Sequence, residues 1–385
     1  MAIQSKLVQD FDDFLKLREP WNELVRNCDV DHAFMRHEWF ECWVRHLGTA
    51  DNLRILTVWS DGLMVAAAPL QMKRQKLKGM PLRVLSFMSS SVSPRCNFIL
   101  HSSCDSAGFF NEVFAIRAWD LVYTENLEVG LATTNKYLEY LKSGIFRNYD
   151  TEPGRQSPHQ ILDTDWDSYL KTLSKNHRKN IRAALRRLEE LGEYEFLEFE
   201  TYEGSEIIFE QMVVVSGSSW KSEFGTDLKS NPKIAAFYKD FSRLGSREGL
   251  WKLYMLRIGN ALVAFDYLLK HNNSLTGIRS DYDPAYKDLM PGHLMKVATI
   301  RDLCSRGVPW EYDMGGMAAE YKKGYVKNVR EHINVTACSF KPYGQALMFG
   351  KKVIWPLVKK FKKQRGGISE NSSAPAEEEN VSPDR

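Results

Sequence analysis

Residues 251–326 have the sequence WKLYMLRIGNALVAFDYLLKHNNSLTGIRSDYDPAYKDLMPGHLMKVATIRDLCSRGVPWEYDMGGMAAEYKKGYV, and this stretch decides the fold. Runs rich in β-forming residues, 251–258 and 261–269, flank the pair Gly259-Asn260, whose positive φ angles suit a two-residue hairpin turn. A third such run, 275–279, follows a polar bend. The stretch therefore predicts three consecutive antiparallel strands.

A helix and a returning strand follow these three strands. After a loop from Asp281 to Met290, Pro291-Gly292 opens a segment whose apolar residues recur on one helical face, and Gly307 ends it. A short strand from Pro309 to Tyr312 then places Asp313 at its end. The free amides and the dipole of such a helix start favour a pyrophosphate.

This order of elements resembles the acyl-CoA-binding half of the GNAT N-acetyltransferases. The string formed by Asp281-Tyr282, Pro291-Gly292, Asp313 and Gly316 to Tyr321-Lys322 is more closely similar to the CelD-like acetyltransferases of bacterial polysaccharide and cellulose biosynthesis. That group is in turn similar to the FemABX aminoacyl transferases. The resemblance covers about residues 10–345, with specific motifs only in the second half. It implies an α+β fold of tandem duplicated GNAT-like domains, each a mostly antiparallel central sheet flanked by helices.

The sequence also repeats itself in outline. VRHLGTADNLRILTVWSDGLMVAAAPL, from Val44, and FSRLGSREGLWKLYMLRIGNALVAFDYLL, from Phe241, both join a helix end at Leu-Gly to a strand, a tight turn and a strand that contains Val-Ala. This similarity predicts an internal duplication. The first copy lacks a Pro-Gly helix start, so we expect the N-terminal half to shape the cleft and the C-terminal half to hold the cofactor.

Composition and the family resemblance together predict four regions along the chain. A polar segment with Pro and Gly, 148–159, is the expected boundary between an N-terminal GNAT-like domain, 1–150, and an acyl-CoA-binding domain, 160–345. A basic amphipathic segment, 346–365, is followed by a tail rich in Ser, Glu and Pro, 366–385, which we expect to be disordered.

The basic segment suggests where the protein resides. Residues 348–365, MFGKKVIWPLVKKFKKQR, combine apolar side chains with seven Lys or Arg and no acid. Such a segment suits an anionic membrane surface, where each basic residue adds ~1 kcal/mol, or a membrane-bound synthase; packing back on the domain is the alternative. No apolar run approaches the ~20 residues of a membrane span, and no signal peptide is recognisable. We expect a cytoplasmic protein, peripheral at the inner face of the cell membrane.

Overall charge and motifs exclude several other classes. Lys and Arg number 52 against 49 Asp and Glu, which gives no reason to expect binding to DNA or RNA. The six cysteines lack Cys-x-x-Cys pairs and histidines at zinc spacing, so we predict no metal. No dinucleotide fingerprint, phosphate-binding P-loop or nucleophile elbow occurs, which argues against kinases and hydrolases.

Two segments before the central stretch supply candidate substrate-binding residues. Apolar spacing predicts one long helix over 166–188, ended by Gly192, with Lys and Arg along another face. Arg178 is the best candidate there for contact with phosphates, because a guanidinium grips phosphate bidentately; a solvated charged face is the alternative. Trp220 and Lys221 match a family position beside the acceptor, although Trp220 in the core and Lys221 on the surface would be the plain structural reading.

Acyl transfer from a thioester requires a bound acyl-CoA, acetyl-CoA or another, as co-substrate. The candidate cofactor-binding residues are Tyr286, Lys287, Pro291, Gly292 and His293. Their main-chain amides would bind the diphosphate, with Gly292 allowing close approach and Lys287 adding charge. His293 is also a weak candidate for general base, because the helix dipole lowers its basicity.

The candidate catalytic residues are Asp313, Tyr321 and Lys322. Asp313 is a base or an acceptor-orienting group, or else a turn aspartate before two glycines. Tyr321 is the acid that returns a proton to sulfur, by analogy with GNAT enzymes, or it fills a hydrophobic slot. Lys322 stabilises the oxyanion, binds an acceptor phosphate or is simply solvated. Asp281 and Tyr282 are expected to line the acceptor side.

Three functional hypotheses follow. The leading one is an acyl-CoA acyltransferase that modifies an amine or hydroxyl of a sugar or sugar-nucleotide in bacterial surface polysaccharide synthesis. A FemABX-like transferase that uses aminoacyl-tRNA is the first alternative. A non-catalytic scaffold of a membrane polysaccharide synthase is the second.

Overall fold

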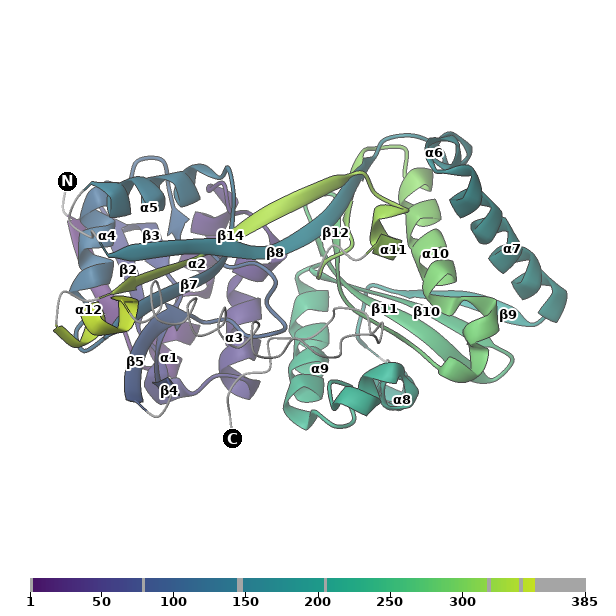
Figure 1. The fold of residues 1–385 in the computed structure, drawn as a ribbon, viewed down its shortest axis with the longest axis horizontal. Helices are drawn as coiled ribbons and strands as arrows, with labels where there is room; N and C mark the ends of the chain where they lie inside the picture. The colour runs from purple at the N-terminus through teal and green to yellow at the C-terminus, as the bar shows by residue number, and fades with distance from the viewer. Residues whose placement is uncertain are drawn as a thin grey trace, which may run out of the picture.

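A computed structural model describes residues 3–77, 80–143, 148–203, 206–316, 320–338 and 342–349. The predicted tail, and the predicted basic segment from residue 350 onward, lie outside the described residues. The chain forms two lobes that lie side by side, the N-terminal half in one and most of the C-terminal half in the other (Figure 1). Strands β8 and β14 run from one lobe to the other.

The elements of the first lobe come in chain order, with η marking 3₁₀ helices. They are β1 (Ile3–Val8), α1 (Phe11–Leu15), α2 (Arg18–Arg26), η1 (Ala33–Met35), α3 (His37–His46), η2 (Ala50–Asn52), β2 (Ile55–Ser60), β3 (Leu63–Ala68), β4 (Leu70–Leu77), β5 (Met80–Phe87), β6 (Ile99–Leu100), α4 (Ser106–Ala115), β7 (Leu121–Glu128) and α5 (Ala132–Lys142).

The remaining elements include the two strands that link the lobes. They are β8 (Tyr149–Leu162), α6 (Trp166–Thr172), α7 (Lys175–Leu191), β9 (Tyr194–Phe199), α8 (Glu206–Ser218), η3 (Trp220–Phe224), α9 (Pro232–Arg247), β10 (Trp251–Ile258), β11 (Ala261–His271), β12 (Ser274–Tyr282), η4 (Pro284–Leu289), α10 (Pro291–Ser305), β13 (Trp310–Asp313), α11 (Glu320–Lys323), β14 (Asn328–Cys338) and α12 (Pro342–Phe349).

Most strands join one sheet that passes through both lobes. Its order is β4-β5-β7-β14-β8-β13-β12-β11-β10-β9, and a smaller sheet has the order β1-β2-β3-β6. Only the pairs β5·β7 and β12·β13 are parallel among these described strands. The fold is therefore the expected α+β type, with mostly antiparallel sheets flanked by helices.

The expected boundary segment 148–159 is part of strand β8 rather than a loop. It pairs with β14 from Tyr149↔Ala337 to Pro153↔Ile333 and again from Gln156↔Glu331 to His159↔Asn328, and the end of β8, His159 to Leu162, pairs with β13. Gly154 lies at a register shift, where a Cβ would come within 3.0 Å of the His332 carbonyl carbon. The polar composition that suggested a linker is tolerated because pairing with β14 satisfies the main chain. The late strand β14 thus completes the sheet of the first lobe, and the two halves are interleaved.

The two expected hairpins are confirmed. Asp61 and Gly62, with φ of 50° and 84°, turn β2 into β3. Gly259, with φ of 54°, turns β10 into β11; only the first residue of that turn has a positive φ, whereas both were expected to. The helices before the hairpins, α3 and α9, pack against each other through Trp39, whose ring centroid lies 4.9 Å from that of Phe237. This arrangement is that of a tandem duplication.

The long helix expected over 166–188 is two helices. Leu173, with ψ of 158°, is extended and separates α6 from α7. The Ser174 side chain accepts a hydrogen bond from the amide of His177 at 3.2 Å and starts the second helix. An N-capping serine inside an apolar repeat was the missed signal. Gly192 ends α7 with φ of 82°, as expected.

The sheet of the second lobe separates two cores. Leu268 of β11 joins the core formed with α6, α7 and α10, and this side is called the α10 face below. Its neighbours Tyr267 and Leu269 join the core that contains α8, α9 and the first lobe, and this side is called the interlobe face. Successive residues of a strand point to opposite faces, so each candidate residue on these strands belongs to one face only.

Burial of His332 on β14 predicts a pH-dependent stability. Its ring is 3% exposed, and burial, followed by the charge of Arg95, lowers its pKa to about 4. The folded protein keeps this histidine neutral while the unfolded chain takes up a proton near the ordinary pKa of ~6.5, so the stabilisation is complete above that pH and is lost as pH falls toward 4. Denaturant unfolding at pH 7 and 4.5 should show a decline that is smaller in His332→Gln by roughly 2–3 kcal/mol. An equal decline of the unfolding free energy in the natural protein and in His332→Gln would contradict this role of His332.

Candidate functional site

The site is organised by a fork between β12 and β13. These parallel strands pair only from Ser274↔Glu311 to Thr276↔Asp313, after which β13 ends and β12 continues. Two glycines close the base of the fork: Gly315 has φ of 58°, and a Cβ there would lie 1.8 Å from the carbonyl oxygen of Gly277. Beyond this contact the main chain of β12 is no longer paired with β13.

On the α10 face, the helix that follows β12 begins at the surface. Met290 is its N-cap residue in the left-handed conformation, with φ of 56°, and Pro291 is buried in the first turn. Gly292 is exposed, and a Cβ built on it would meet nothing within 4 Å. Pro291 has no N–H, and the amides of His293 and Leu294 donate to the carbonyl of Met290 at 2.9 and 3.2 Å, so Gly292 supplies the first-turn amide that is left for an anion at this helix start. In the loop before it, Tyr286 packs against the core of the α10 face and Lys287 is exposed.

A cluster of two histidines and a tyrosine lies behind this helix start. His293 Nδ1 is 2.5 Å from the hydroxyl of Tyr325, and the His177 ring lies edge-on to Tyr325 with centroids 4.3 Å apart. Burial lowers the pKa of His293, and burial together with His293 lowers that of His177. Burial raises the pKa of Tyr325. Both imidazoles are therefore biased toward their neutral forms, which suits a proton acceptor. Sequence reasoning missed His177 and Tyr325, because neither stands in a motif.

A buried ion pair joins α10 to the fork. Lys296 Nζ lies 2.7 Å from Asp266 Oδ2 and 2.9 Å from Ser280 Oγ, and both charged side chains are almost fully buried. A buried charge requires such a partner, because an isolated charge in the interior is strongly unfavourable. The pair fixes helix α10 relative to β11 and β12. It also went unpredicted, because Lys296 and Asp266 read as ordinary helix and strand residues.

On the interlobe face, the structure brings together three of the predicted acceptor residues. Lys221 Nζ is 2.6 Å from Asp281 Oδ1 and donates to the carbonyl of Ser280 at 2.9 Å. Trp220 is 38% exposed, and its ring lies 5.9 Å from the ammonium of Lys221. Tyr282 follows Asp281 on the strand, so it points to the α10 face and packs in the core there. Asp281 and Tyr282 therefore lie on opposite faces.

Asp313 is fully buried and held between two arginines. Its Oδ2 atom accepts from Arg330 Nη1 at 2.6 Å and from Arg95 of the first lobe. Its Oδ1 atom accepts from the amide of Gly315 at 2.7 Å, the contact of a turn aspartate. Burial, followed by the charge of Arg330, lowers the pKa of Arg95 to about 10. Because both carboxylate oxygens are engaged, this geometry favours a positioning role for Asp313 over proton abstraction.

A cavity of about 260 Å³ lies between the lobes beside this network. It is lined by residues of both lobes: Asp29, Asp31, His32, Ala33, Phe34, Arg95, Glu128 and Leu131 from the first, and Leu269, His271, Asn272, Ser274, Thr276, Glu311 and Arg330 from the rest of the chain. His271 Nε2 is 2.6 Å from Asp31 Oδ1 across this junction. Thr276 and Glu311 belong to the β12–β13 pair, so the cavity borders the interlobe side of the fork.

The other three candidates occupy different positions. Tyr321 is 52% exposed. Lys322 donates to the carbonyl of Gly315 at 2.7 Å, which places its ammonium at the fork. Arg178 Nη1 donates to the carbonyls of Lys171 at 3.2 Å and Leu173 at 2.5 Å, so this guanidinium caps the end of α6. Contact of Arg178 with a ligand phosphate stays a prediction.

Comparison with known proteins identifies the class of the second lobe. The family model of the acetyltransferase (GNAT) domain matches residues 175–323. This segment contains the fork and α10, and it marks the protein as an acyltransferase with a GNAT domain. A sequence search of curated proteins gives no match.

Solved structures share the whole fold at low sequence identity. A crystal structure of FemX is 13% identical, with a TM-score of 0.57, over 90% of this chain and 100% of that chain. The structure assigned as the C-terminal domain of a lysylphosphatidylglycerol synthetase from Agrobacterium fabrum is 11% identical, with a TM-score of 0.51, over 88% of this chain and 96% of that chain. At these identities the similarity shows the fold alone.

Two further findings concern the described part of the chain. None of its helices is both long and apolar enough to cross a bilayer. Within the same ranges, no group of three or more His, Cys, Asp or Glu is arranged to hold a metal ion.

Proposed function

We propose that this protein transfers an acyl group from acetyl-CoA or another acyl-CoA to an amine or hydroxyl of a sugar or sugar-nucleotide in bacterial surface polysaccharide synthesis. One observation carries the donor assignment: Gly292 stands exposed in the first turn of α10, with open space around it, in the first α-helix after the strand that leaves the fork. The helix start supplies the amide of Gly292 and the positive potential of the helix dipole for the diphosphate of the coenzyme. The pathway rests on the CelD-like resemblance of the sequence.

We assign the two substrates to opposite faces of the sheet. The coenzyme lies on the α10 face, and the acceptor approaches from the interlobe face, where the 260 Å³ cavity opens beside the base of the fork. Lys221 and Asp281 form a polar pair on that side that suits hydroxyl or amine groups. Acids and arginines both line the cavity, which fits an acceptor that carries donors as well as acceptors of hydrogen bonds.

We assign the proton transfers to residues near the fork. Lys322, held at the carbonyl of Gly315, is placed to stabilise a developing oxyanion, and the exposed Tyr321 returns a proton to the thiolate. The neutral His293, bonded to Tyr325, is a candidate base on the α10 face. Asp313 orients the fork through Gly315. Peripheral membrane attachment through residues 348–365 and a cytoplasmic location belong to the same proposal.

Substitution of Gly292 tests the donor site. Gly292→Asp should weaken CoA binding by about tenfold or more, because a carboxylate at the helix start repels the diphosphate. The fold should be unaffected, since the position is open and an acid in the first turn of a helix is favourable by ~0.3–1 kcal/mol. Calorimetric titration with CoA measures the affinity, and thermal unfolding checks the fold. The matched variant Gly292→Ala should bind CoA nearly as the natural protein does. Equal binding by all three proteins would contradict the proposal.

Aminoacyl transfer is the second candidate, and the fold shared with FemX over 90% of this chain favours it. Titration with CoA and with aminoacyl-tRNA separates the two donors. Binding of CoA that is lost in Gly292→Asp supports acyl-CoA as the donor. Binding of aminoacyl-tRNA alone supports aminoacyl transfer. If neither donor binds and no thioester is cleaved with a panel of sugar acceptors, the scaffold hypothesis replaces both.

A further inference from the structure

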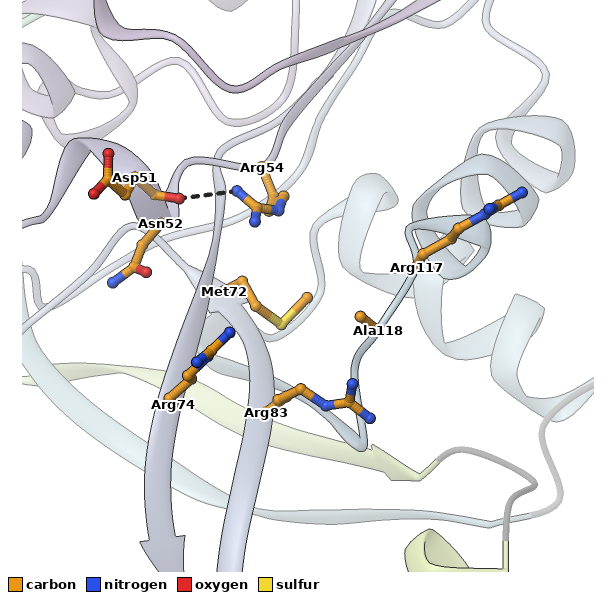
Figure 2. Close-up of a pocket in the computed structure, with 8 residues that line it drawn as sticks. All are labelled: Asp51, Asn52, Arg54, Met72, Arg74, Arg83, Arg117 and Ala118. Atoms are coloured by element: carbon orange, nitrogen blue, oxygen red, sulfur yellow. Dashed lines mark hydrogen bonds between the residues drawn. The ribbon is translucent and has the colours of Figure 1, made fainter.

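A second hollow, of about 330 Å³, lies entirely on the first lobe (Figure 2). Its lining residues are Asp51, Asn52, Arg54, Met72, Arg74, Arg83, Arg117 and Ala118. Figure 2 shows Arg54, Arg74 and Arg83 around Met72, with Arg117 and Ala118 on the far side. All of them lie outside residues 175–323, so this hollow, called the arginine pocket below, is separate from the acyl-transfer site.

Strand pairing forces two of these arginines together. Arg74 on β4 lies directly opposite Arg83 on β5 in the antiparallel register. Like charges in this position are destabilising unless something neutralises them. Arg83 is neutralised by Asp120, which accepts from its Nε at 3.1 Å and its Nη2 at 2.9 Å. Arg74 is exposed and makes neither an ion pair nor a side-chain hydrogen bond within the described ranges. The pair thus retains one uncompensated positive charge.

Local backbone contacts position Arg54, whereas Arg117 extends outward. Arg54 Nη1 donates to the carbonyls of Asp51 at 3.1 Å and Leu53 at 2.5 Å, which holds its guanidinium at the rim. Arg117 is exposed and extends outward beside Ala118. Ala118 has φ of 77°, a left-handed conformation that costs ~1–2 kcal/mol for a residue with a Cβ. Such strain is found at ligand-binding sites, where the surrounding structure maintains it.

The charge and shape of the pocket define the class of ligand. The lining residues carry four guanidinium groups, against the carboxylate of Asp51 in the lining and that of Asp120, which pairs with Arg83, so the pocket has an excess of positive charge. Guanidinium forks match phosphate oxygens bidentately, and such charge-assisted hydrogen bonds are about twice as strong as neutral ones. Arg117 extends away from the pocket, so its contact with a bound anion requires a rotamer change, which exposed side chains make rapidly.

We propose that the arginine pocket binds a phosphate-bearing group, as a second ligand site independent of acyl transfer. The group is either the phosphate or diphosphate of a soluble molecule or the phosphate of an anionic lipid headgroup. In both cases Arg74 and Arg117 supply the uncompensated charges, and Arg54 and Arg83 complete the rim.

Inorganic pyrophosphate is the probe for the first source. Calorimetric titration of the full chain should show a site whose affinity falls about tenfold or more in Arg74→Ala with Arg117→Ala. The matched control, Lys233→Ala with Arg247→Ala, removes two exposed charges from α9 and should bind as the natural protein does. Pyrophosphate also suits the start of α10, so the titration is repeated in Gly292→Asp, which leaves the arginine pocket intact. Because Arg74 and Arg117 are exposed, the double variant should unfold at nearly the natural temperature.

Sedimentation with vesicles tests the second source. Vesicles of phosphatidylcholine with phosphatidylglycerol are compared with phosphatidylcholine alone, for the natural protein, the double variant and the control. Loss of pyrophosphate binding with vesicle binding unchanged assigns the site to a soluble phosphate, and loss of vesicle binding assigns it to a headgroup. If the double variant matches the control in both assays, the inference is overturned, whatever the outcome for CoA.

Discussion

Gly315→Ala is expected to destabilise the protein by more than ~3 kcal/mol and to abolish acyl transfer in whatever remains folded. The added Cβ would lie 1.8 Å from the carbonyl oxygen of Gly277, and the residue has φ of 58°. Main-chain atoms on both sides of this contact belong to the fork, so no flexible side chain can move aside. Relief of the clash requires β12 and the turn after β13 to separate, which displaces the Lys322 ammonium from its carbonyl.

Gly316→Ala is the matched control for this substitution. Gly316 also has a left-handed backbone, with φ of 61°, but its Cβ would meet only the end of the Lys322 side chain at 3.0 Å. Gly316→Ala should lower the free energy of unfolding only by the ~1–2 kcal/mol that a left-handed backbone costs a residue with a Cβ. Urea unfolding of both variants measures the difference, and thioester cleavage with acetyl-CoA measures the activity. Equal stability of the two variants would mean that the close approach of Gly315 to Gly277 is not required.

Asp313→Asn is expected to destabilise the protein by about 3–5 kcal/mol, because it leaves the buried Arg95 without its counter-charge, whereas Arg330 keeps Glu128 and Glu311. Arg95 comes from the first lobe and Arg330 from β14, so the substitution weakens ion pairs that join the two lobes. If Asp313 were instead a general base, the variant would keep its stability and lose only turnover. Unfolding and turnover measured on the same preparations therefore distinguish a positioning residue from a base.

An exposed ion pair serves as the control for Asp313. Glu195 pairs with Arg257, and both side chains are about half exposed. Glu195→Gln makes the same change from carboxylate to amide, and it should alter stability by no more than ~1 kcal/mol. A double-mutant cycle with Arg95→Gln then measures the coupling between the lobes. A coupling energy near zero would show that this ion pair does not join them.

Local sequence was enough to predict the hairpins and the start of helix α10. Asp61-Gly62 and Gly259 have positive φ angles at low cost, and Pro291 is suited to a first helical turn, so these features depend on neighbouring residues alone. The break at Leu173 was missed although the capping residue Ser174 follows it, because the apolar repeat continues across the break. Periodicity is a weaker signal there than a capping side chain.

Three features could not be predicted from local sequence: strand β8, the opposite faces of Asp281 and Tyr282, and the buried pair of Asp266 and Lys296. The segment 148–159 has the composition of a linker, and only its pairing with β14, far along the chain, makes it a strand. The face occupied by Asp281 and by Tyr282 follows from strand alternation once β12 is paired, which separates two residues that one motif had grouped. The pairing of Asp266 with Lys296 likewise depends on how α10 crosses the sheet.

By itself the sequence determined the order of strands, the exposed helix start at Gly292 and the class of acyltransferase that this order resembles, since turns, caps and periodicity act over a few residues. Tertiary structure alone decided that Asp313 is enclosed by Arg95 and Arg330, and that four arginines from separate segments line one hollow on the first lobe. The physical reason is range: a buried charge is stabilised by whatever partner the fold brings near, and Arg95 lies 218 residues from Asp313 along the chain.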